Sequence, residues 1–83
     1  MNTMNEKQIV VITSGWVVIG NTFPVEGGIL IEDASVIRTW GTTKGIGEIA
    51  LNGPTKDTVL DYAGKIRVLN HAIIMKIDCI YDK

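Results

Sequence analysis

The sequence predicts a small, mainly β fold with one short helix, and two observations carry that prediction. The apolar stretches are short and rich in β-branched residues, as in QIVVIT at residues 8–13 and WVVI at residues 16–19. Only residues 42–53 combine apolar side chains at helical spacing with a stop signal. We therefore expect a curled sheet or small barrel of about six short strands, with the helix closing an open end.

The length of the chain limits it to one domain. Eighty-three residues, 46% of them hydrophobic, bury only about 60–65% of the surface of the unfolded chain. Such a domain is marginally stable alone, so we expect a homo-oligomer. Residues 1–6 are polar and without periodicity, which predicts a flexible N-terminus before a single β-rich domain over residues 7–83.

Turn signals divide the N-terminal half into strands. Residues 14–15 (SG) join the first two apolar runs as a hairpin, residues 20–24 (GNTFP) are expected to form a loop, and residues 27–28 (GG) a second break. Residues 29–40 then form either two strands or one long bent strand. Both faces of the hairpin are apolar, so the fold or another subunit must cover them, and we favour another subunit.

The helix is expected to begin at Thr42 or Thr43, whose hydroxyl would cap it, and to end at Gly53. Glu48 suits the positive end of the helix dipole. The apolar residues on one face, which predict that the helix docks on the sheet, are Ile46, Ile49, Ala50 and Gly53.

The C-terminal half continues as strands. Residues 58–62 are expected to be extended, and residues 63–64 to form a turn. Residues 65–68 are expected to form a strand with one solvent-exposed face. Residues 70–71 interrupt the pattern, and residues 72–81 give the last strand.

No catalytic or metal-binding constellation is visible, so we expect neither an enzyme nor a cofactor. His71 is isolated, Cys79 lies on an apolar face without a basic neighbour, and Ser14 lacks the elbow pattern of hydrolases. Glu32 and Asp33 are adjacent, so they point to opposite sides of a strand and make a poor acid/base pair.

Charge and cysteine content narrow the partners and the location. The net charge of -1 argues against a broad electrostatic contact with nucleic acid. No apolar run is long enough to span a membrane, and no export signal is visible. The single cysteine suits a reducing, cytoplasmic setting.

The glycine-rich loop at residues 41–47 is the one candidate ligand site. It lies between a strand and a helix N-terminus, where backbone N–H groups favour an anion, and it is not a Walker loop. A guanidinium for phosphate and an indole for a base precede it. The candidate ligand-binding residues are Arg38, Trp40, Thr42, Thr43, Lys44, Gly45 and Gly47.

A purely structural interpretation of the same residues stays open. The glycines would permit tight turns, Trp40 would pack in the core, and Arg38 would pair with Glu48 or Asp33.

The run RTWGTTKGIGEIALNGP resembles a segment shared by a family of small uncharacterised bacteriophage and prophage proteins. The final strand, within LNHAIIMKIDC, is similar to the closing strand of that family, and the resemblance covers about residues 28–79. The chain departs from the family in having fewer arginines around the tryptophan. The matching positions are Arg38, Trp40, Glu48, Ile49, Ala50, Leu51 and Gly53.

The resemblance transfers no activity, but it implies action in the cytoplasm of an infected bacterial cell. The leading hypothesis is a non-enzymatic, homo-oligomeric phage protein that counters host defence. It would sequester a nucleotide-derived immune signal, such as a cyclic nucleotide or a cyclic ADP-ribose-like molecule. The alternative is a protein–protein interaction module, either a minor virion or assembly component or a direct inhibitor of a host protein.

Overall fold

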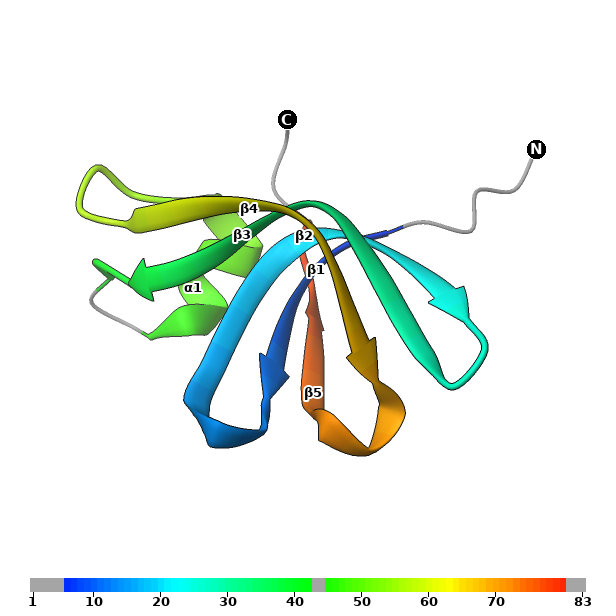
Figure 1. Cartoon of the computed structure of the whole chain (residues 1–83). Coiled ribbons are helices and arrows are strands. Elements are labelled where there is room, and N and C mark those ends of the chain that lie inside the picture. Colours follow the sequence, from blue (N-terminus) through cyan, green and yellow to red (C-terminus); the bar gives the residue numbers. More distant parts are fainter. Residues whose placement is uncertain (1–5, 43–44, 81–83) are drawn as a thin grey trace.

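The computed structural model describes residues 6–42 and 45–80, which form one curled antiparallel sheet and one short helix (Figure 1). This confirms the predicted mainly β class. The strands are β1 (Glu6–Ile12), β2 (Trp16–Val25), β3 (Gly28–Thr39), β4 (Val59–Leu69) and β5 (Ile73–Asp78), and the helix is α1 (Ile46–Asn52).

The sheet has the order β4-β3-β2-β1-β5. Strands β1 to β4 therefore follow one another as a meander, and β5 returns to pair with β1. Short 3₁₀ turns at Thr13–Gly15 and Asn70–Ala72 join β1 to β2 and β4 to β5. No ladder joins β4 to β5 among the described residues, so the curled sheet is not closed into a barrel.

The strands are fewer and longer than expected, because two predicted breaks are parts of strands. Residues 20–24 belong to β2, where Pro24 lies opposite Ile29 of β3. The pairing of β2 with β1 ends at Thr22, so the missing N–H of Pro24 is not required by a second neighbour. Residues 63–64 likewise lie inside β4, and the turn expected there was wrong.

Residues 28–39 form one long bent strand, which decides between the two interpretations of this segment. Asp33 has a φ of 50°, Gly64 of β4 has a φ of 83°, and the β3–β4 register shifts around Ala34. Because side chains alternate along a strand, the irregularity lets Ile31 and Ala34 face the same cluster. The sheet can thereby curl over its own apolar side chains.

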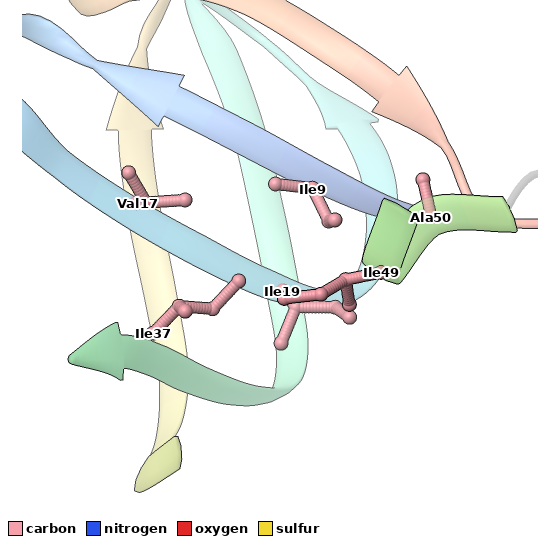
Figure 2. Close-up of a cluster of buried hydrophobic side chains, with 6 residues drawn as sticks. All are labelled: Ile9, Val17, Ile19, Ile37, Ile49 and Ala50. Atoms are coloured by element: carbon pink, nitrogen blue, oxygen red, sulfur yellow. The ribbon is translucent and has the colours of Figure 1, made fainter. Parts of the chain in front are cut away.

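Two hydrophobic clusters lie on opposite faces of the sheet. One unites β1, β2 and β3 with the helix (Figure 2), and consists of Ile9, Val17, Ile19, Ile37, Ile49 and Ala50. The other lies on the face that the curled strands enclose, and consists of Val10, Val18, Ile29, Ile31, Ala34 and Val68. Most apolar residues on both faces of the N-terminal hairpin are thus buried within the chain, so another subunit is not needed to cover them, and the homo-oligomer stays a prediction.

The helix docks as its apolar face predicts. Ile49 and Ala50 are buried, and Gly53, with a φ of 87°, donates its N–H to the Ile49 carbonyl over 2.7 Å. The expected threonine cap was wrong, because the N-cap is Gly45 without a side-chain bond, and Thr43 lies outside the described residues. No helix of the described chain has the length and apolar character needed to cross a membrane.

Candidate functional site

The glycine-rich loop uses its polar groups to hold its own conformation. The Thr42 hydroxyl donates to the Gly45 carbonyl over 2.7 Å. The Thr55 hydroxyl donates to the Gly41 carbonyl over 2.7 Å, and the Thr58 hydroxyl donates to the Trp40 carbonyl over 2.6 Å. These bonds fix the end of β3 against the segment that leads from α1 into β4.

The other predicted ligand residues of this loop are only partly described. Thr43 and Lys44 lie outside the described residues. Gly45 is the N-cap of a helix of seven residues, and Gly47 lies inside its first turn. The indole of Trp40 is 43% exposed, so the alternative that placed Trp40 in the core was wrong.

Arg38 forms a bidentate ion pair with Asp61 on the neighbouring strand β4. Arg38 Nε donates to Asp61 Oδ2 over 2.8 Å, and Nη2 donates to Oδ1 over 3.1 Å. Because Asp61 is the ion-pair partner, the expectation that Arg38 pairs with Glu48 or Asp33 was wrong, and Asp33 instead accepts from the Tyr62 hydroxyl over 3.4 Å.

The ion pair changes the titration of both groups. The hydrogen bonds and charge of Arg38 hold the pKa of the Asp61 carboxyl below its ordinary value. The hydrogen bonds and charge of Asp61 in turn raise the pKa of the Arg38 guanidinium. Both side chains are exposed, so the pair serves to orient Arg38 more than to stabilise the fold.

Arg38 lines a cavity, and this cavity does not include the glycine-rich loop. Strands β2 and β3 pair as far as Val18 and Val36, but β2 begins at Trp16 and β3 continues to Thr39. The unpaired strand ends border an open cavity of about 480 Å³, which we call the notch. Its lining residues are Ser14, Gly15, Trp16, Val17, Val36, Ile37, Arg38 and Asp61.

The notch is lined by Trp16 of β2 and by Arg38 of β3. Each of them lies two residues beyond the last ladder pair, Val18–Val36. Trp16 is 58% exposed, although tryptophan is a large apolar residue. In Figure 1 the β1–β2 turn points away from the end of β3 and the start of β4, which lie side by side.

The two strands that border the notch are each paired with a further strand on their other side. Trp16 pairs with Ile12 of β1, and Thr39 pairs with Val59 of β4. From the sequence, Trp16 was expected only to begin a strand. The signal that was available is a tryptophan directly after a turn, where the neighbouring strand need not cover it.

The described residues gather no group of three His, Cys, Asp or Glu side chains that could hold a metal ion. His71 lies exposed in the 3₁₀ turn between β4 and β5, and Cys79 is half-buried beside the helix cluster. Neither residue lines the notch.

Comparison with known proteins finds no matching family model, no matching curated protein and no matching solved structure. The resemblance to small bacteriophage proteins therefore stays a prediction, and the site has to be interpreted from its own geometry.

Proposed function

We propose that the protein is a non-enzymatic binding module that holds an extended segment of a protein partner in the notch. The observation that carries the proposal is the early end of the β2–β3 ladder. Residues 16–17 and 37–39 are strand residues, yet no ladder pair joins them across the notch in the described chain. An extended peptide satisfies such backbone groups by adding a strand.

The side chains around the notch suit this use. Trp16 offers a flat apolar surface with few rotatable bonds, and such residues carry much of the energy of protein interfaces. The volume of about 480 Å³ falls within the range of ligand sites, roughly 300–1,000 Å³. Because each side of the notch is already paired with a further strand, little ordering has to accompany binding.

The setting we propose is the one implied by the resemblance: a phage-type protein in the bacterial cytoplasm that binds a host or virion protein directly. It needs no reaction and no cofactor.

Peptide selection followed by NMR tests the proposal. A random peptide library is selected against the whole chain, and selected peptides are titrated into ¹⁵N-labelled protein. We expect the indole N–H of Trp16 and the amides of residues 15–17 and 36–38 to shift first. Trp16→Ala should weaken binding at least tenfold, as loss of a central aromatic contact does.

Trp40→Ala is the matched control, because it removes the other exposed tryptophan outside the notch. It should bind the same peptides as the wild type does. Shifts that centre elsewhere, or binding that is unchanged in Trp16→Ala, would show that the notch is not the site.

One observation keeps nucleotide capture as a second candidate function. The exposed indole of Trp40 beside the glycine-rich loop is a surface on which a base can stack. Thermal shift with cyclic oligonucleotides and cyclic ADP-ribose isomers tests it. Nucleotide capture is favoured over peptide binding if a ligand raises the melting temperature of Trp16→Ala but not that of Trp40→Ala. The ligand should then be recovered unaltered.

A further inference from the structure

We infer that the notch receives the C-terminal end of a partner chain, and that Arg38 binds the terminal carboxylate. This inference rests on the proposed peptide-binding function and names the part of the partner that is recognised.

The shape of the notch favours a chain end. A segment that pairs with both strand ends meets the Val18–Val36 pair, where β2 and β3 join. Val18 is buried there and belongs to the enclosed cluster, so the ladder does not open further without loss of core packing. A strand inserted in the plane of the sheet has to stop at this pair, and a terminus can do so where a continuous chain has to turn away.

Asp61 balances the charge of Arg38 at the notch, so recognition of a carboxylate terminus rests on the hydrogen-bond donors that Arg38 has left. Each carboxylate oxygen of Asp61 already accepts a hydrogen bond from Arg38. On Arg38 the bonds use Nε and Nη2, whereas Nη1 donates to no residue of the described chain. The guanidinium is planar and has two edges that can bind a carboxylate. The edge formed by Nη1 and Nη2, which Asp61 leaves open, can bind a second carboxylate in bidentate geometry.

Trp16 supplies the remaining contact. It lines the notch together with Arg38, so an apolar side chain close to the terminus of the partner would pack on its indole. The expected ligand is an extended peptide with an apolar residue near a free C-terminal carboxylate.

The experiment uses peptides selected from a library that displays free C-termini. Each peptide is synthesised as the free acid and as the C-terminal amide, and its affinity for the intact protein is measured by titration calorimetry. The amide should bind the wild type about tenfold more weakly, as expected when a charge-assisted hydrogen bond is lost. Against Arg38→Gln the preference for the acid should disappear or reverse, because the Asp61 carboxylate then lines the notch without its guanidinium partner.

Arg67→Gln is the matched control, since Arg67 is an exposed arginine of β4 outside the notch. It should keep the full preference for the acid. Equal binding of acid and amide to the wild type, together with dependence on Trp16, would overturn the terminal-carboxylate inference and leave the peptide function standing. The inference would be overturned in the same way if amidated peptides with an internal Asp bound the wild type more tightly than Arg38→Gln. Failure of every peptide to bind at the notch would overturn both proposals.

Discussion

Gly41 lies so close to the backbone of Asp57 that a Cβ atom on Gly41 would stand 2.3 Å from the Asp57 carbonyl carbon. Gly41 also has a φ of 66°, which side chains disfavour. The hydroxyls of Thr55 and Thr58 bond to the carbonyls of Gly41 and Trp40 at the same place. The first glycine of the loop is thus required by the chain itself, for the junction between β3 and the segment before β4.

Gly41→Ala is therefore expected to lower the free energy of unfolding by about 2 kcal/mol or more, from backbone overlap and a strained φ. Gly47→Ala is the matched change in the same loop-and-helix segment. Nothing lies within 4 Å of a Cβ at Gly47, so the helix should gain up to about 1 kcal/mol. Urea denaturation measures both, and equal effects would contradict this account.

Ile49→Ala is expected to cost about 2–5 kcal/mol, because Ile49 is fully buried where α1 meets the sheet (Figure 2). If that variant does not fold, Ile49→Val should cost about 0.5–1.5 kcal/mol. Leu51→Ala, on the exposed side of the same helix, should change stability by less than about 0.5 kcal/mol. A cost at Leu51 as large as at Ile49 would mean that the helix face is wrongly assigned.

The helix and its docking face could be predicted because their signals are local. The spacing of Ile46, Ile49 and Ala50 and the stop at Gly53 lie within a few residues, and the structure bears them out. The breaks expected at residues 20–24 and 63–64 are absent because glycine and proline signal a turn only where no neighbouring strand holds the chain extended. Pairing with β3 carries the chain through both segments.

The candidate site was harder to predict because its contacts are distant in sequence. Arg38 was singled out, but its partner Asp61 is 23 residues away and becomes a neighbour only through the β3–β4 register. Trp16 lines the same notch as Arg38 only because the β2–β3 ladder stops at Val18. A register is set by turns and bulges along the whole sheet, so short motifs do not reveal such a pair.

Thr22→Val is expected to destabilise the protein by about 1–2 kcal/mol. Thr22 is buried and donates to Gln8 Oε1 over 2.7 Å, while Gln8 Nε2 donates to Asp78 Oδ1 over 2.7 Å. The change removes a donor from this chain of hydrogen bonds, which joins β2, β1 and β5. Thr39→Val at the exposed end of β3 should change stability by less than about 0.5 kcal/mol, and a similar loss at both sites would contradict the argument.

The ion pair of Arg38 and Asp61 predicts a defined pH dependence. Arg38 holds the pKa of the Asp61 carboxyl below its ordinary value of 3.8, so the folded chain binds this proton less readily than the unfolded chain. The resulting stability is present above about pH 3.8 and is lost as the pH falls further toward the lower pKa of the folded state. The melting temperature of the wild type should therefore exceed that of Asp61→Asn at pH 6, and the difference should shrink below pH 3.8.

Because both side chains are exposed, this difference should be small and should also diminish in 1 M salt, where the Debye length is only about 3 Å. Repeating the comparison in an Arg38→Gln background isolates the pair. There Asp61→Asn should leave the pH dependence of the melting temperature unchanged, since no guanidinium remains to lower the pKa of Asp61. If the pH-dependent difference persists in that background, another group causes it. The titration would then give no support for the orientation of Arg38 by Asp61.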